Sequence, residues 1–155
     1  MNHSCDVIKR LADKGKTIAT AESLTGGGIG AALTAVPGAS AVYRGGVVSY
    51  TNEVKNHILG VQTETLRTYG AVSEQAAGEM ASGARKIIGS DIAVSVTGLA
   101  GPDGDDFGHP VGTVFIGYED AHTAIVYHFC FSGDREAIRN QTIEAALQLI
   151  LLYDT

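Results

Sequence analysis

The sequence predicts a fold of the α/β class, with a mixed, mostly parallel sheet that helices cover on both faces. In the first two thirds of the chain, short apolar runs alternate with segments of helical periodicity, which is typical of parallel strands joined by helices. Two β-rich runs then follow each other across a short turn, as in an antiparallel hairpin. The length of 155 residues, with 45% hydrophobic and 18% charged residues, predicts one globular domain over residues 1–155.

Helices are predicted where apolar residues recur at helical spacing between start and stop signals. Residues 4–14 place Val7, Ile8 and Leu11 on one face, and Gly15 follows as a stop. Ser73 is the predicted N-cap of the most regular amphipathic segment. The predicted helices are residues 4–14, 26–36, 53–59 with Asn52 as the N-cap, 63–68, 74–88 and 134–153.

Strands are predicted in the apolar and β-branched runs between these helices. The first three are residues 16–21, 42–51 and 91–98. The last two are residues 112–119 and 123–131, which a turn near residues 119–121 joins into the hairpin. Residues 98–110 form the one long loop, and they connect the third strand to this hairpin.

The charge and hydropathy of the chain exclude several classes of protein. A net charge of −6 is unsuited to a general nucleic-acid surface, but it allows one small anionic ligand in a local pocket. No apolar run approaches the ~20 residues of a membrane-spanning helix, and the N-terminus has no secretory signal. Cys5 and Cys130 form no C-x-x-C pair, so both are expected to be reduced. We therefore expect a cytoplasmic protein.

The acidic segment of the long loop raises the question of a metal site. Asp103, Asp105, Asp106 and His109 do not have the spacing of an EF-hand, and no two histidines lie at i and i+4 on a predicted helix. A solvated loop tip explains these charges, so we predict no metal and no cofactor.

Three of the predicted strands end in polar residues, within residues 22–27, 49–52 and 95–98. Open α/β sheets bind ligands just beyond the carboxyl ends of their strands. If the three strands are parallel neighbours, their polar ends converge on one cleft, which is a stronger signal than any single stretch.

The first stretch has two interpretations. Ser23 or Thr25 could cap the following helix, which is worth ~1 kcal/mol. Alternatively, Ser23 is a nucleophile, and the free amides of residues 25–28 bind an oxyanion or a phosphate. A dinucleotide-binding loop is disfavoured, because the next strand ends in Ser49 and Tyr50 and not in a carboxylate. The sequence leaves the cap and the nucleophile open.

Lys55, just after the second strand, could supply the base that a serine nucleophile needs. Ser–Lys pairs are a known alternative to Ser–His–Asp triads. Such a lysine must be partly buried, because burial lowers its pKa and makes the neutral amine accessible. The alternative is a solvated lysine on a helix, which is the commoner case.

Five further residues could bind a ligand at the same cleft. Tyr50 ends the second strand, and Thr97 with Gly98 ends the third, either facing a ligand or forming an ordinary packed turn. Arg135 and Arg139 lie four apart on the last predicted helix. They either form helix salt bridges or clamp a phosphate or carboxylate, since the guanidinium fork fits such groups.

Six stretches together resemble one family: TAESLTGGGIG, VSYTNEVKNHILGV, YGAVSEQAAGEMASGAR, SVTGLAGPDG, PVGTVFIGY and FSGDREAIRNQT. In this order, from about residue 7 to residue 150, they resemble the C-terminal domain of competence/damage-inducible protein CinA. This family includes stand-alone nicotinamide-nucleotide amidases of the PncC type. The resemblance implies a three-layer α/β/α sandwich that hydrolyses nicotinamide mononucleotide to nicotinic acid mononucleotide and ammonia without a metal. It also allows a homo-oligomer.

The resemblance implies roles for individual residues. Ser23 of the Ala-Glu-Ser-x-Thr-Gly-Gly motif corresponds to the nucleophile, and Lys55 to its base. Tyr50 and Thr97 are expected to orient the carboxamide. The predicted substrate-binding residues are Glu22, Thr25, Gly26, Gly27, Gly98 and Arg135, with Arg139 as the alternative to Arg135.

Two departures limit what the resemblance implies. Full-length CinA proteins carry a further N-terminal domain that has no counterpart in this sequence, so the resemblance does not imply the activity of that domain. Residues 103–109 match no fixed motif, and their carboxylates inherit no role.

The rival hypothesis is a non-catalytic module in which the glycine loop and Arg135 hold a nucleotide without turnover.

Overall fold

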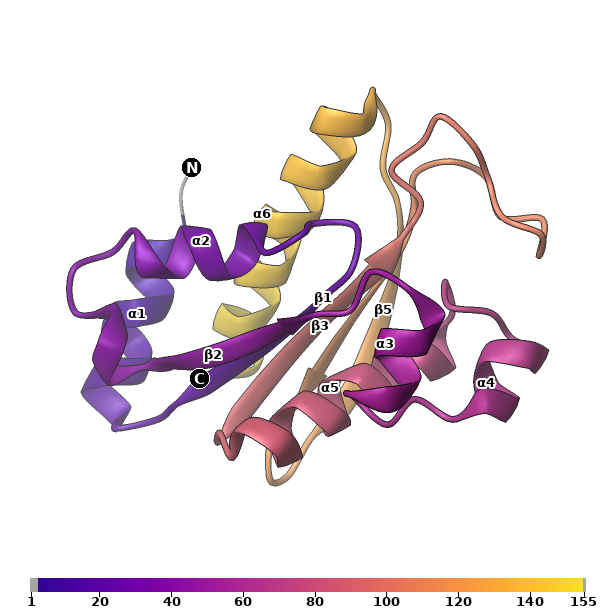
Figure 1. Cartoon of the computed structure of the whole chain (residues 1–155). Coiled ribbons are helices and arrows are strands. Elements are labelled where there is room, and N and C mark those ends of the chain that lie inside the picture. The colour runs from indigo at the N-terminus through magenta and orange to yellow at the C-terminus, as the bar shows by residue number, and fades with distance from the viewer. Residues whose placement is uncertain (1–2, 155) are drawn as a thin grey trace.

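The computed structural model describes residues 3–154, which form a five-stranded sheet in the order β2-β1-β3-β4-β5 (Figure 1). The strands are β1 (Ile18–Glu22), β2 (Tyr43–Val48), β3 (Ile92–Gly98), β4 (Thr113–Glu119) and β5 (Ala124–Cys130). β1 pairs in parallel with β2 and β3, whereas β4 pairs antiparallel with β3 and β5. Four of these five strands therefore run in one direction, which confirms the predicted mixed, mostly parallel sheet and its hairpin.

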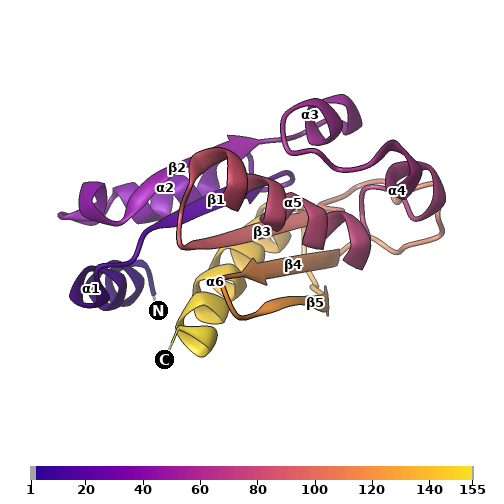
Figure 2. The same cartoon turned by 90° about the horizontal axis from the view of Figure 1, so that it is seen from below.

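Helices cover both faces of the sheet. The elements are α1 (Ser4–Lys14), α2 (Gly28–Thr34), the short 3-10 turn η1 (Ala39–Ala41), α3 (Asn52–His57), α4 (Thr63–Thr68), α5 (Glu74–Ile88) and α6 (Arg135–Tyr153). α1, α2 and α6 pack on one face, and α5 packs on the other (Figure 2). The predicted three-layer α/β/α sandwich is confirmed.

Each face of the sheet has its own hydrophobic core, because successive strand residues point to opposite faces. Ile18 and Val94 join the large cluster beneath α1, α2 and α6. Ala19, Ala21 and Ala93 join the smaller cluster beneath α5. Small residues on this second face let α5 pack closely on the sheet.

The helix ends test the predicted caps. Ser73 accepts a hydrogen bond from the Ala76 amide at the start of α5, as predicted. The prediction of Asn52 as the N-cap of α3 is wrong, because the Thr51 hydroxyl caps that helix and Asn52 is its first residue. Both residue types cap well, so the sequence alone could not separate two adjacent candidates.

The topology places an opening at the carboxyl end of β1. The chain leaves β1 through α2 to reach β2 on one side, and it then crosses through α3, α4 and α5 to reach β3 on the other side. Ligands bind at such reversals of strand order in open α/β sheets. Over residues 3–154, no helix is both long and apolar enough to cross a lipid bilayer.

Candidate active site

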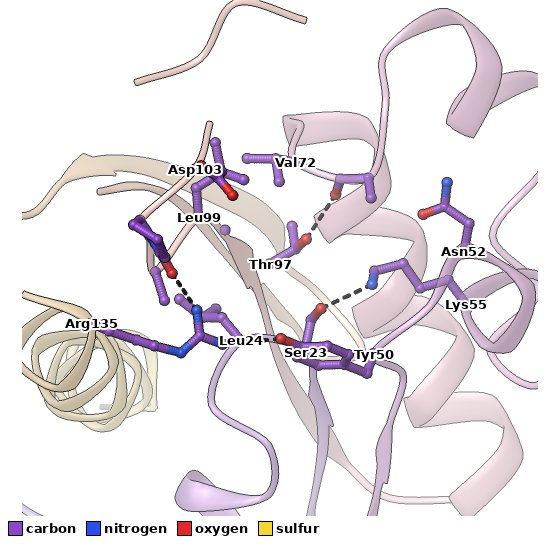
Figure 3. A pocket seen from close by; sticks show the side chains of 15 residues that line it. Ser23, Leu24, Tyr50, Asn52, Lys55, Val72, Thr97, Leu99, Asp103 and Arg135 are labelled. Atoms are coloured by element: carbon purple, nitrogen blue, oxygen red, sulfur yellow. Dashed lines mark hydrogen bonds between the residues drawn. The ribbon is translucent and has the colours of Figure 1, made fainter. Parts of the chain in front are cut away.

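A pocket of about 420 Å³ opens at the carboxyl ends of β1, β2 and β3 (Figure 3). This volume lies in the range of small-molecule sites. The predicted site residues that line it are Ser23, Tyr50, Lys55, Thr97, Gly98 and Arg135. The three polar strand ends therefore converge, as the sequence predicted.

Ser23 and Lys55 form a buried pair at this pocket (Figure 3). The Lys55 ammonium donates to Ser23 Oγ over 2.9 Å and to the carbonyl oxygen of Ser49 over 2.6 Å. Ser23 is 7% exposed and Lys55 only 2% exposed. The solvated helix lysine that the sequence left open is thereby excluded. Thr51 caps α3 shortly after β2, and Lys55, about one turn further along, is the buried residue of this helix.

Burial lowers the pKa of Lys55 from its ordinary 10.5 to about 8. None of the ion pairs among the described residues includes this lysine, so no carboxylate counteracts the loss of hydration. An amine with a pKa near 8 is partly neutral at physiological pH. Its lone pair can then accept the hydroxyl proton of Ser23, the only hydroxyl to which Lys55 is hydrogen-bonded within residues 3–154.

The carboxylate of Glu22 occupies the N-terminus of α2. It accepts hydrogen bonds from the Thr25 hydroxyl over 2.6 Å, from the Ile29 amide over 2.9 Å and from the Gly30 amide over 3.0 Å. Glu22 is 2% exposed and does not line the pocket. Glu22 was predicted to contact the substrate, but its carboxylate instead accepts hydrogen bonds from amides at the start of α2, where one of the two interpretations of the sequence placed an external anion.

The loop between β1 and α2 is closed by its own hydrogen bonds. The Gly26 amide donates to the Ser23 carbonyl, and the Gly28 amide to the Thr25 carbonyl. Gly26 and Gly27 have φ angles of 59° and 101°, so they form the turn, and Gly27 is the N-cap of α2. Thr25, Gly26 and Gly27 do not line the pocket. The N-cap residue Gly27 has no side chain, and Glu22 supplies the acceptor for the first amides of α2, which excludes the cap interpretation of Ser23 and Thr25.

The two arginines of α6 have different surroundings. Arg139 lies outside the pocket and donates to the carbonyl oxygens of Leu24 and Thr25, over 2.9 and 3.1 Å. Arg135 lies on the pocket rim, where it donates to the Tyr50 hydroxyl over 3.1 Å and to the Gly101 carbonyl (Figure 3). Arg135 is thus the arginine that faces the pocket, and Arg139 fixes the loop behind the serine.

Tyr50 and Thr97 both line the pocket, but the first side chain is exposed and the second is buried. Tyr50 is 60% exposed, so its ring stands at the mouth of the pocket. Thr97 is buried and donates its hydroxyl proton to the Ala71 carbonyl over 2.8 Å. Its oxygen therefore keeps lone pairs that can accept a hydrogen bond from a ligand.

Some lining residues were not predicted from the sequence. The connection between α4 and α5 contributes Ala71 and Val72, and the loop after β3 contributes Leu99 and Asp103. Ala71 acts through a backbone carbonyl, which leaves no sequence signal. For the loop after β3, the sequence did offer a signal, because Thr97 and Gly98 form a polar strand end and Gly101 follows in the loop.

The family model for the CinA C-terminal domain matches residues 2–153. The chain belongs to this family. A CinA-like protein of Thermotoga maritima is 47% identical over 148 residues, which are 95% of this chain and 36% of that protein. The chain thus spans about a third of the length of the CinA-like relatives. The nicotinamide-nucleotide amidohydrolase PncC of Shigella flexneri is 45% identical over 97% of this chain and 92% of its own length.

Solved structures of the CinA family agree with the fold. The competence/damage-inducible protein CihA of Agrobacterium tumefaciens has a TM-score of 0.95 at 39% identity, covering 99% of this chain and 94% of its own. The competence or damage-inducible protein of Enterobacter asburiae has a TM-score of 0.95 at 34% identity, with both chains fully covered. The family resemblance of the sequence is therefore confirmed along with the fold.

Proposed function

We propose that this chain is an amidohydrolase that converts nicotinamide mononucleotide to nicotinic acid mononucleotide and ammonia. The observation that carries the chemistry is the buried hydrogen bond of 2.9 Å between Lys55 Nζ and Ser23 Oγ at the pocket. The substrate is supported by the similarity to PncC of Shigella flexneri, which this chain matches over nearly the whole length of both proteins. The product would return a pyridine nucleotide to NAD synthesis.

Ser23 acts as the nucleophile in this proposal. Neutral Lys55 takes the hydroxyl proton while Ser23 Oγ attacks the carboxamide carbon, which gives a tetrahedral oxyanion. As the C–N bond breaks, Lys55 returns the proton to the departing nitrogen, and ammonia leaves an ester on Ser23. Lys55 then takes a proton from water as the water attacks this ester. Breakage of the ester bond releases the acid and restores the Ser23 hydroxyl.

The amides of residues 25–28 were predicted as donors to the oxyanion, but another amide is better placed for this role. The Gly26 and Gly28 amides donate within their own turns. The Leu24 amide follows the nucleophile directly, and Leu24 lines the pocket. Over residues 3–154 it donates to no other group. We therefore assign the Leu24 amide as the oxyanion donor, an interaction whose loss typically costs about a hundredfold in rate.

The remaining lining residues would hold the rest of the substrate. Thr97 can accept a hydrogen bond from the carboxamide nitrogen, because its own proton is committed to Ala71. Tyr50 stands at the mouth, where its ring can contact the pyridine. Arg135 keeps further N–H groups for the nucleotide phosphate beyond those it gives to Tyr50 and Gly101.

The test is ammonia release from nicotinamide mononucleotide by the purified chain in the presence of a chelator. We expect turnover in the wild type and a loss of about 10³-fold or more in Ser23→Ala, because the nucleophile is gone. Thr25→Ala is the matched control, since this hydroxyl lies in the same loop outside the pocket. Turnover that survives Ser23→Ala would refute the nucleophile. Nucleotide binding without any turnover would instead favour the non-catalytic binding module.

The pH dependence of kcat/KM is expected to follow Lys55. The neutral amine is the active form, so kcat/KM should rise about tenfold per pH unit below a pKa of about 8 and level off above it. The measurement is kcat/KM for nicotinamide mononucleotide from roughly pH 7 to 10, above the range in which a substrate phosphate with a second pKa of about 6 titrates. A profile that is flat between about pH 7 and 9 would contradict Lys55 as the base.

A further inference from the structure

The loop between β3 and β4 reaches across to the connection between α4 and α5. Figure 1 shows this loop extending from the sheet toward α4. At its tip the ring of Phe107 lies on Gly70, so closely that a β-carbon on Gly70 would be 2.7 Å from the ring. Neither residue lines the pocket, but Gly70 directly precedes the lining residues 71–72, and Phe107 belongs to the same loop as the lining residues 99–103.

The tip of the loop is held in one shape by Asp105. Its carboxylate accepts hydrogen bonds from the amides of Phe107 and His109, over 3.1 and 3.0 Å. It also pairs with the His109 ring over 2.7 Å, and that ring packs edge-on against Phe115 of β4. Phe107 is therefore presented to Gly70 by a hydrogen-bonded turn and not by a free chain end.

Phe107 contacts Gly70, and the next two residues, Ala71 and Val72, line the pocket. Ala71 follows Gly70, and its carbonyl oxygen accepts the hydroxyl proton of Thr97. Val72 lines the pocket, as do Leu99 and Asp103 at the start of the same long loop (Figure 3). A displacement of residues 70–72 would therefore move both the partner that orients Thr97 and one wall of the substrate site.

We propose that Phe107 is a positioning residue, which fixes the width of the substrate pocket by clamping residues 70–72 against the loop of residues 99–112. The proposal rests on the amidase function proposed above. Phe107 is half exposed and does not touch the reacting atoms, so its removal should loosen substrate binding more than it slows the chemical step.

The first arm of the test compares kinetic constants for nicotinamide mononucleotide. Phe107→Ala is expected to raise KM roughly tenfold while kcat changes less than about threefold, because a wall and not the nucleophile is displaced. Phe107→Tyr keeps the ring and should restore the wild-type KM. Ile87→Ala, which removes another exposed apolar side chain, from α5, is the control and should change neither constant. A KM for Phe107→Ala within about twofold of wild type would overturn the proposal.

The second arm does not depend on turnover. Amide hydrogen exchange of residues 70–73 should be faster in ligand-free Phe107→Ala than in the wild type, and Phe107→Tyr should reverse the change. In the Ser23→Ala background, adding Phe107→Ala should weaken binding of nicotinamide mononucleotide by roughly the same tenfold. Unchanged exchange in this segment would refute the clamp even if the amidase is confirmed. A faster exchange with no hydrolysis in the wild type would refute the amidase and keep the clamp.

Discussion

Replacement of Lys55 by methionine is expected to lower kcat/KM by about 10³-fold or more and, at the same time, to raise the melting temperature at pH 7. The activity falls because Ser23 loses the base that accepts its proton. Methionine keeps the length and the apolar stem of the side chain, so the substitution removes the amine with little change in packing. The opposite signs of the two effects follow from one fact, the burial of an amine without a carboxylate partner.

The gain in stability follows from the pKa of Lys55. The shift from 10.5 to about 8 corresponds to about 3 kcal/mol by which burial disfavours the charged form. Methionine removes this penalty, but it leaves the Ser49 carbonyl and Ser23 Oγ without their donor, at a cost of roughly 1–3 kcal/mol. We therefore expect a net gain of about 1 kcal/mol, or roughly 2–4 °C in melting temperature.

The pH dependence of this gain separates it from other causes. Between about pH 8 and 10.5 the unfolded chain keeps the proton of Lys55 while the folded chain releases it, so the wild type becomes more stable as the pH rises. The advantage of Lys55→Met should therefore be full well below pH 8, vanish near pH ~9, where the wild type has gained about 1 kcal/mol, and be reversed by about pH 10.5. Thermal unfolding at several pH values measures it, with Ser23→Ala as an inactive control that keeps the amine. A Lys55→Met protein that is less stable than the wild type at pH 7 would contradict the unpaired buried amine.

The part of the site that could be predicted is the part made by side chains at strand ends. Ser23 directly follows β1, Thr97 is the second-last residue of β3, and Lys55 lies in the first turn of α3, the helix that follows β2. Because the three strands are parallel neighbours, these positions had to converge once the order of the sheet was as expected. The polar residues at the ends of apolar runs were therefore a sufficient signal.

The loop between β1 and α2 could not be predicted in the same way. A glycine-rich turn at a helix start is compatible with an external anion or with an internal one. Which anion occupies the helix start depends on the direction of the Glu22 side chain, and in the structure this carboxylate accepts hydrogen bonds from the Ile29 and Gly30 amides. Likewise, Arg135 and Arg139 are equivalent by spacing, and only the position of α6 over the loop makes Arg139 a support for Leu24 and Arg135 a rim residue.

Replacement of Glu22 by alanine is expected to lower the melting temperature by roughly 10 °C and to reduce kcat strongly. The substitution leaves the buried Ile29 and Gly30 amides and the Thr25 hydroxyl without an acceptor. Unpaired buried groups cost roughly 1–3 kcal/mol each, and the cavity adds to this. For a chain of this length, a loss of about 3–5 kcal/mol lowers the melting temperature by roughly 6–20 °C. Ser23 follows Glu22 directly, so a disordered turn would also displace the nucleophile.

Graded substitutions at Glu22 decide between an internal and an external anion at α2. Glu22→Gln keeps the shape and one acceptor oxygen, so it should cost less than Glu22→Ala and more than Thr25→Val, which removes a single hydrogen bond. If the helix end instead served the substrate phosphate, removing the carboxylate charge would free two amides and lower KM for nicotinamide mononucleotide. We expect no such decrease, because the carboxylate and both amides are buried away from the pocket. Thermal unfolding and KM measured on the same three variants test both statements. A tighter KM in Glu22→Gln with an unchanged melting temperature would restore the phosphate-binding role of the glycine loop.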